Sequence, residues 1–170
     1  MTTSPLHSTV SRDLERTQAQ PATTDAPRTS APVLVGVDGS SQSIYALRRT
    51  VRLADSLDAP VRAALVWSPE GAAGHTGAKT HREAERALNL VVNSVFGIRS
   101  PSWFSKIVRE GSPASVLIEE SAGSQMLVVG HHGSGDLNDG DLGSVSAACA
   151  GRAHCPVLIT HDVRPGAELE

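Results

Sequence analysis

The stretch MLVVGHHG at residues 126–133, followed by the pair GS at residues 143–144, decides the fold of this chain. Its first four residues form a short apolar run that predicts a buried strand. The small residues at 145–150 then predict a helix. Glycines permit positive φ angles and close backbone approach, and a helix start offers unpaired N–H groups to an anion. The segment therefore predicts a phosphate-binding loop, although an ordinary strand–loop–helix connection with turn glycines would have the same spacing.

The front of the chain repeats this arrangement. The apolar run at 33–37 predicts a buried strand, and Ser40 or Ser41 is a suitable N-cap for a following helix. Asp38 then lies at the carboxyl end of the strand, which is the edge where open α/β sheets bind ligands. A turn or capping role for Asp38 is the alternative. The inward positions of the predicted helix are Ile44, Leu47, Val51 and Ala54.

Strand and helix patterns alternate through the rest of the chain. Apolar runs predict further strands at 61–67, 103–109, 126–130 and 156–160, and helical spacing predicts helices at 81–96 and about 114–121. Such alternation is typical of parallel sheets with helices on both faces and right-handed crossovers. We therefore expect an α/β fold with an open five-stranded parallel sheet.

Three segments together resemble the universal stress protein family. They are VGVDGS at 35–40, the pattern Gly130-x2-Gly133-x9-Gly143-Ser144, and CPVLI at 155–159. Their order and separations fit one domain, and the resemblance spans about residues 32–162. It implies a Rossmann-like fold of the adenine nucleotide alpha hydrolase-like type, ATP as the ligand, and a homodimer.

The resemblance also implies which residues bind the nucleotide. The glycines and Ser144 would cradle the phosphates, and Val145 would extend the contacts at the helix start. Asp38 would face the ribose or the adenine, and Val66 would bound the base through its backbone. The implied site residues are Asp38, Val66, Gly130, Gly133, Gly143, Ser144 and Val145.

The loop departs from the family pattern in its charges. It contains His131 and His132 together with Asp136, Asp139 and Asp141. A carboxylate about 6 Å from a phosphate charge costs about 0.7 kcal/mol in water and about 3 kcal/mol at an effective dielectric of about 20. The aspartates can point to solvent, or Mg²⁺ can bridge them to the phosphates. A protonated histidine would strengthen phosphate binding.

No other metal or catalytic chemistry is expected. Adjacent histidines on extended backbone point to opposite sides, and no HExxH or paired CxxC spacing occurs. The chain also lacks a GxSxG elbow and a GxxxxGK[ST] loop. We therefore predict a protein that is not an enzyme, with slow ATP hydrolysis at most.

Composition narrows the function classes. The chain has 170 residues and a net charge of −3, which gives no electrostatic footprint for nucleic acid. Its two cysteines, Cys149 and Cys155, make no disulfide framework, and Cys149 is expected to be a small buried apolar residue. No membrane span or secretory signal is apparent, so a cytoplasmic location is expected. Residues 1–31 predict a disordered tail before a domain at 32–162, and residues 163–170 predict a frayed end.

Two functions remain open from the sequence. In the first, the protein is a stress-response regulator that binds ATP and acts as a nucleotide-dependent switch on a partner that the sequence does not name. In the second, the aspartate-rich loop has lost ATP, and the same fold serves as a nucleotide-free dimeric interaction module. An apolar last strand at a sheet edge invites pairing with a second copy in either case. The residues expected at that contact are Pro156, Val157, Leu158 and Ile159.

Overall fold

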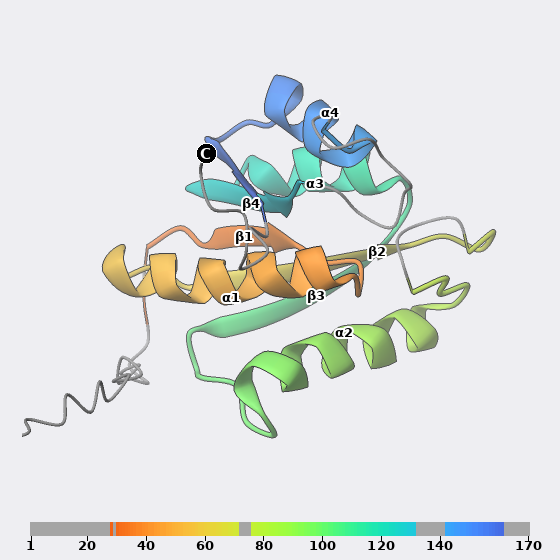
Figure 1. The fold of residues 1–170 in the computed structure, drawn as a ribbon, viewed down its shortest axis with the longest axis horizontal. Coiled ribbons are helices and arrows are strands. Elements are labelled where there is room, and N and C mark those ends of the chain that lie inside the picture. Colours follow the sequence, from red (N-terminus) through yellow and green to blue (C-terminus); the bar gives the residue numbers. More distant parts are fainter. Residues whose placement is uncertain (1–27, 29, 72–75, 132–141, 162–170) are drawn as a thin grey trace, which may run out of the picture.

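Strands and helices alternate along the whole domain (Figure 1). The computed structural model describes residues 28, 30–71, 76–131 and 142–161. In chain order its elements are β1 (Val33–Gly36), α1 (Ser41–Ser56), β2 (Val61–Trp67), α2 (His81–Phe96), β3 (Phe104–Glu110), α3 (Pro113–Ser121), β4 (Met126–Gly130), α4 (Ser144–Arg152) and β5 (Val157–Thr160).

The five strands form one parallel sheet in the order β3-β2-β1-β4-β5. Val35 of β1 pairs with Ala63 of β2 on one side and with Val128 of β4 on the other. The chain therefore adds β2 and then β3 on one side of β1, and afterwards crosses back to add β4 and β5 on the other side. This reversal between β1 and β4 is a topological switch point, where open α/β sheets bind ligands. The predicted fold class is confirmed.

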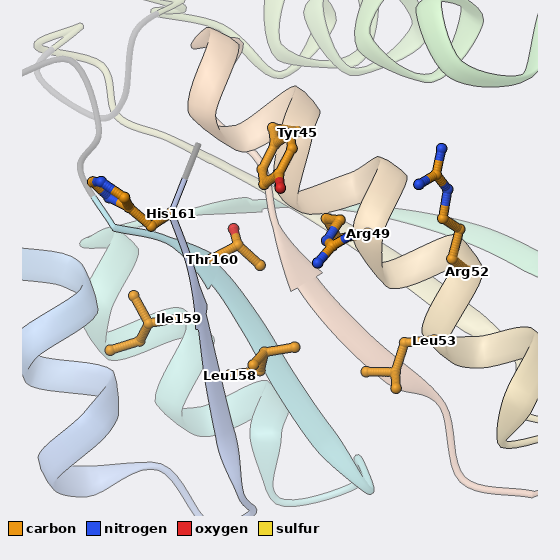
Figure 2. Close-up of a pocket in the computed structure, with 8 residues that line it drawn as sticks. All are labelled: Tyr45, Arg49, Arg52, Leu53, Leu158, Ile159, Thr160 and His161. Atoms are coloured by element: carbon orange, nitrogen blue, oxygen red, sulfur yellow. The ribbon is translucent and has the colours of Figure 1, made fainter. Parts of the chain in front are cut away.

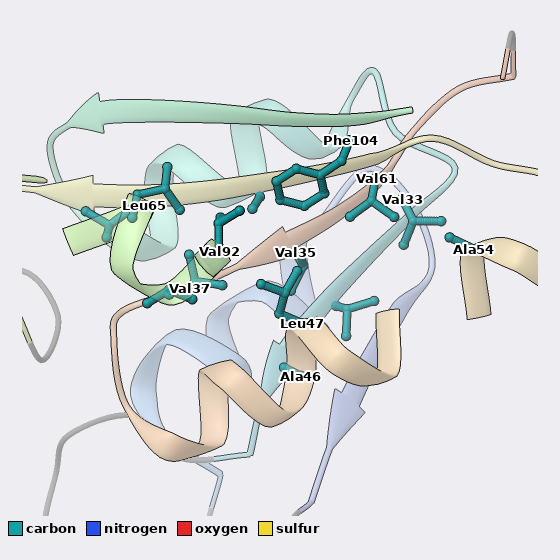
Figure 3. Packing of buried hydrophobic residues seen from close by; sticks show 14 of the residues in the cluster. Val33, Val35, Val37, Ala46, Leu47, Ala54, Val61, Leu65, Val92 and Phe104 are labelled. Atoms are coloured by element: carbon teal, nitrogen blue, oxygen red, sulfur yellow. The ribbon is translucent and has the colours of Figure 1, made fainter. Parts of the chain in front are cut away.

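Helices cover both faces of the sheet, and each face has its own apolar core. Val35 belongs to the core under α1 and α2, whereas its neighbour Leu34 belongs to the core under α3 and α4. Both side chains are fully buried. Because successive side chains point to opposite faces, a strand buried on both sides must be apolar throughout. Figure 3 shows the larger core, in which Leu47 of α1 packs near Val35 and Val37.

The helices begin at residues that are suited to helix N-termini. Ser40 is the N-cap of α1, and its hydroxyl accepts a 3.2 Å hydrogen bond from the Ser43 N–H. Thr80 caps α2 in the same way, accepting from the Glu83 N–H at 3.2 Å. Pro113 occupies the first turn of α3, where its missing N–H leaves no helical bond unmade.

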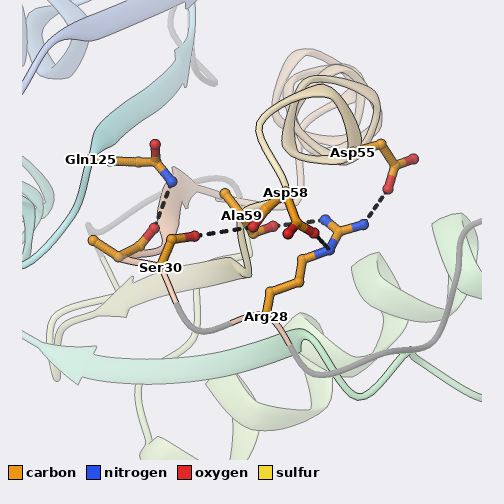
Figure 4. Close-up of polar contacts among 7 residues, drawn as sticks. Arg28, Ser30, Asp55, Asp58, Ala59 and Gln125 are labelled. Carbon is orange, nitrogen blue, oxygen red and sulfur yellow. Dashed lines mark hydrogen bonds and ion pairs between the residues drawn. The ribbon is translucent and has the colours of Figure 1, made fainter.

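The segment before β1 is anchored at the amino-terminal edge of the sheet (Figure 4). The Arg28 side chain is only 7% exposed and lies 2.5 Å from an Asp55 carboxylate oxygen. It also donates to the Ala59 carbonyl at 2.7 Å and stacks over the Trp103 ring at 4.3 Å from the centroid. Ordered contacts thus extend upstream of residue 32, the predicted start of the domain, whose limits remain a prediction. Within the described residues, no helix is both long and apolar enough to cross a membrane.

Candidate functional site

Two helix starts open at the carboxyl edge of the sheet, beside the switch point. Ser40 begins α1 directly after β1, and Gly143 begins α4 after the loop that follows β4. The first N–H groups of each helix have no acceptor within the helix, and both helix dipoles place positive potential there. This edge therefore presents donors and positive potential to an anion.

Asp38 is fixed beside the first helix start by hydrogen bonds. Its Oδ1 atom accepts from the Ser40 N–H at 3.0 Å and from the Ser40 hydroxyl at 2.6 Å. Asp38 therefore has the turn-forming role that was its alternative, and it lies at the ligand edge as well. Gly39, which lies between Asp38 and Ser40, has a φ of +85°, and a Cβ at this position would lie 2.9 Å from Thr76 Cγ2. Sequence reasoning did not single out this glycine, although its position between two turn residues was a signal.

Gly130 ends β4 at a close approach to α1. A Cβ on Gly130 would lie 3.3 Å from Gln42 Cβ and 3.4 Å from the Gln42 carbonyl carbon. Its φ is outside the left-handed range, and Gly143 has a φ of −57°. Close approach rather than positive φ therefore explains the need for glycine at position 130.

Hydrogen bonds draw the two ends of the β4–α4 loop together. The Gly143 N–H donates to the His131 carbonyl at 3.0 Å, and the His131 N–H donates to the Thr160 carbonyl of β5 at 2.8 Å. Ser144, the first residue of α4, is exposed, whereas Val145 packs partly into the core under α4. Gly133, His132, Asp136, Asp139 and Asp141 lie outside the described residues.

Val66 lies on β2 beyond the end of its pairing with β1. The last pair of that ladder is Gly36 with Ala64, whose carbonyl accepts from the Val37 N–H at 2.9 Å. The Trp67 carbonyl, in contrast, accepts from the Gly111 N–H on the β3 side at 2.9 Å. Because backbone groups alternate sides along a strand, those of Val66 point toward the β1 side. A planar ligand group bound beyond the end of β1 would be placed to hydrogen-bond with the backbone N–H and C=O of Val66.

Three buried polar atoms on elements that meet this edge have no hydrogen-bond partner in the described part of the chain: Gln42 Oε1 in the first turn of α1, Trp67 Nε1 at the end of β2, and Ser68 Oγ just after it. A fourth such atom, Trp103 Nε1, belongs to a residue that precedes β3 at the opposite edge. Buried polar groups are normally paired, and the first three stand at element ends on the carboxyl side of the sheet, where a polar ligand group could pair with them. Sequence reasoning did not identify Gln42, because nothing local marks its amide oxygen as buried.

The cysteines and histidines add little chemistry. Cys149 is fully buried, as predicted, and burial raises the pKa of its thiol. Cys155 is half-buried and also free. The rings of His131 and His161 touch edge to face, with centroids 4.8 Å apart. Among the residues that the structure describes, no three His, Cys, Asp or Glu side chains are grouped to hold a metal ion.

Comparison with known proteins identifies the family. The model of the universal stress protein family matches residues 30–161, so the chain belongs to that family. The universal stress protein Rv3134c of Mycobacterium tuberculosis (strain H37Rv) is 35% identical over 137 residues, covering 79% of this chain and 50% of that protein. A universal stress protein of Mycolicibacterium smegmatis is 32% identical, with 79% and 46% covered. The chain thus spans about half the length of the curated relatives it matches.

Solved structures agree with this fold. A universal stress protein in complex with cAMP is 25% identical with a TM-score of 0.54, covering 78% of this chain and 98% of that one. The universal stress protein from Archaeoglobus fulgidus in complex with dAMP is 19% identical with a TM-score of 0.55, covering 78% and 98%. The second likeness shows the fold alone. The family predicted from the sequence is confirmed.

Proposed function

We propose that this chain binds an adenine nucleotide, with ATP as the physiological ligand, at the carboxyl edge between β1 and β4. The observation that carries the proposal is the pair of helix starts, at Ser40 and Gly143, that open onto the switch point. The unpartnered buried polar atoms on neighbouring elements support it. Family membership also supports it, because a 25% identical universal stress protein has been solved with cAMP.

Each site residue has a proposed role. The backbone N–H groups of Ser144 and Val145 would hold phosphate oxygens at the start of α4, with Gly130, Gly133 and Gly143 leaving room for the approach. The Asp38 carboxylate would accept from a ribose hydroxyl. The backbone of Val66 would bond the adenine edge. Mg²⁺ would serve as a bridge between the phosphates and the aspartates of the loop.

We further propose that nucleotide occupancy acts as a switch and that the protein is not an enzyme. The proposed homodimer uses β5, which is an outer strand of the sheet. Leu158 on this strand is 38% exposed, and an apolar edge of this kind favours pairing. A nucleotide-free interaction module remains the second candidate, with less support. The cytoplasmic location likewise stays a prediction.

Titration calorimetry of the purified chain with ATP, with and without Mg²⁺, tests the proposal. Ser144→Asp is the critical variant. A carboxylate in the first turn of α4 interacts favourably with the positive end of the helix dipole, but it repels a phosphate group. We expect unchanged or higher thermal stability and an ATP affinity at least about tenfold lower.

The matched control is Ser112→Asp. Ser112 is also exposed at a helix start on the carboxyl edge, but it follows β3, the outer strand on the far side. The Ser112→Asp variant should bind ATP with the affinity of the wild type. Absence of binding at millimolar ATP, or equal binding by the two variants, would refute the nucleotide proposal. Binding that requires Mg²⁺ would assign the bridging role to the aspartates.

A further inference from the structure

The amino-terminal edge of the sheet holds a short peptide of the chain itself (Figure 4). This peptide, which we call the strap, consists of Arg28 and residues 30–32, and it precedes β1. It contacts the end of α1, the turn after α1, and the residues that precede β3 and β4. The strap therefore shows which peptide chemistry this surface binds.

The Arg28 side chain fills a socket that matches a guanidinium group. One of its Nη atoms donates to the Asp55 carboxylate at 2.5 Å, and the other donates to the Ala59 carbonyl at 2.7 Å. The Trp103 ring centroid lies 4.3 Å from the guanidinium carbon. A planar guanidinium can donate in its plane and stack on a ring at once, which the ammonium of a lysine cannot do. The socket therefore selects arginine.

Hydrogen bonds to and from backbone carbonyl groups hold the rest of the strap. The Ser30 hydroxyl donates to the Asp58 carbonyl at 3.1 Å. Gln125 donates through Nε2 to the Ala31 carbonyl at 2.7 Å and through its N–H to the Pro32 carbonyl at 3.0 Å. Because every residue has a carbonyl, these bonds fix the path of a backbone rather than a particular side chain. Arginine is thus the side chain that this surface recognises.

The strap leaves acidic surface beside the socket uncovered. The Asp58 side chain is 95% exposed, and one of its carboxylate oxygens lies 3.7 Å from Arg28 Nε. Asp55 and Asp58 together bring two negative charges to the one positive charge of Arg28. Since Arg28 and Ser30 both contact Asp58, a residue between them in sequence is close to this carboxylate. A basic residue at that position would gain an ion pair that the threonine of this chain cannot form.

This surface lies apart from the nucleotide edge and from the proposed dimer contact. Along α1, Ser40 stands at the nucleotide edge and Asp55 at the socket, so the two sites are at opposite ends of the helix. Trp103 precedes β3, the outer strand opposite β5. The pocket of about 380 Å³ that Arg49 and Leu158 line lies instead beside β5, at the proposed dimer edge (Figure 2). The docking surface therefore does not depend on the nucleotide proposal.

We propose that this surface docks a peptide segment of a partner protein that carries an arginine followed by a second basic residue. The arginine enters the socket in place of Arg28, and the second basic residue pairs with Asp58. The strap is then an autoinhibitory contact, which the partner displaces. A tethered competitor acts at an effective concentration of the order of millimolar, so a chain without Arg28 binds such a peptide more tightly than the wild type.

Calorimetric titration of the full chain with synthetic peptides tests this docking. The nonapeptide TDAPRTSAP reproduces residues 24–32 of the chain. The Arg28→Ala variant should bind this peptide at least about tenfold more tightly than the wild type, whose own Arg28 competes for the socket. The matched control is Arg99→Ala. Arg99 is an exposed arginine of the loop between α2 and β3, so its removal leaves the strap seated and the peptide affinity at the wild-type level.

Changed peptides and further variants identify the contacts. A peptide with lysine in place of Arg28 should bind the Arg28→Ala variant at least about tenfold more weakly, because lysine cannot stack and donate together. The peptide TDAPRRSAP, with arginine in place of Thr29, should bind more tightly than TDAPRTSAP, and Asp58→Asn in the Arg28→Ala background should remove this gain. Asp55→Asn in the same background should abolish binding of both peptides. Arg28→Lys replaces Arg28→Ala if the latter loses its cooperative unfolding transition.

Three results would overturn the proposal. The first is that the folded Arg28→Ala variant binds neither arginine peptide at millimolar concentration, or binds them no better than the wild type does. The second is equal affinity for the lysine peptide, which would exclude a guanidinium socket. The third is equal affinity for TDAPRRSAP and TDAPRTSAP, which would show that the socket serves the strap alone. The Ser144→Asp variant should bind these peptides like the wild type whatever its ATP affinity, which separates this surface from the nucleotide site.

Discussion

The Ser146 hydroxyl donates a 2.5 Å hydrogen bond to the carbonyl oxygen of Gly130. This bond ties the first turn of α4 to the end of β4, across a loop whose ends are also joined through His131 and Gly143. The Gly130 carbonyl lies beyond the last β1–β4 pair, Val35 with Val128. Ser146 thus replaces the ladder partner that β1 no longer provides, and it sets the position of the second helix start.

Ser146→Ala should therefore destabilise the fold and weaken nucleotide binding. Ser146 is only 3% exposed, and loss of a buried hydrogen bond costs about 1–2 kcal/mol. Urea unfolding measures the stability loss, and ATP calorimetry measures the affinity. Ser144→Ala, an exposed serine two residues earlier, is the control for stability and should change it by less than about 0.5 kcal/mol. Equal unfolding midpoints for Ser146→Ala and the wild type would contradict the role of this bond.

Gly130→Ala should be destabilising because of the contact with α1. The added Cβ would lie 3.3 Å from Gln42 Cβ and 3.4 Å from two Gln42 backbone atoms, so the first turn of α1 would have to give by a few tenths of an ångström. Overpacking of this kind costs about 1–3 kcal/mol. Gly123→Ala is the matched control, since a Cβ there has no atom within 4 Å and its φ is not left-handed. That control should be neutral or slightly stabilising. Thermal unfolding of the two variants compares them directly, and equal losses would argue against the close approach.

Gln42→Leu should separate stability from ligand binding. Gln42 Oε1 is buried without a partner in the described part of the chain, so its removal should leave the free energy of unfolding unchanged or raise it by about 1 kcal/mol. If the atom accepts a hydrogen bond from the nucleotide, ATP affinity should fall about tenfold. Chemical denaturation and ATP titration give the two readouts. A clear loss of stability would mean that Oε1 is already satisfied in the folded protein.

Arg28→Ala should release the segment before β1. The variant removes a largely buried guanidinium from Asp55, whose side chain is only 23% exposed, and from the Trp103 ring. We expect a loss of about 2 kcal/mol in urea unfolding. Arg99→Ala, at an exposed loop position, should have little effect. A loss of the same size in both variants would point to net charge rather than to the anchor.

Cys149 should make stability fall at alkaline pH. Burial raises the pKa of its thiol in the folded state, so the folded protein retains a proton that the unfolded chain releases above about pH 8.5. Stability then decreases as pH rises past that value. Cys149→Ala should show a shallower decrease between about pH 8 and pH 10 in denaturant titrations, apart from the cost of the cavity. Parallel curves would exclude the thiol as the cause.

Thiol labelling separates the two cysteines. Cys155 is half-buried and Cys149 is fully buried, and only an accessible thiolate reacts readily. In the native wild type at pH 8, Cys155 should therefore react with a disulfide reagent well before Cys149. Labelling of both cysteines at the same rate would indicate that the core under α4 opens easily.

Local sequence determined the elements of this fold. The bounds of α2 agree with the predicted 81–96, because apolar residues such as Leu88 and Val92 recur with the helical period and Thr80 supplies the cap. The strand ends differ by one residue at β1, β3 and β5, since a backbone ladder rather than the apolar run sets them. The alternation of elements was enough to predict a parallel sheet, and three segments in the right order, VGVDGS at 35–40, the glycine pattern with Ser144, and CPVLI at 155–159, were enough to predict the family.

Only the tertiary structure decided which of these elements meet. Placement of β4 beside β1 brings Gly130 against Gln42, which is far away in sequence, and this contact decides between the two reasons for a glycine, positive φ and close approach, that the sequence left open. Arg28 reaches Asp55 and Trp103 for the same reason, and the pocket of Arg49 and Leu158 joins a helix near the start of the domain to its last strand. Periodicity and capping are properties of neighbouring residues, so the sequence carries them directly. Contacts between distant segments depend on strand order and on the crossovers, which form only when the whole domain packs.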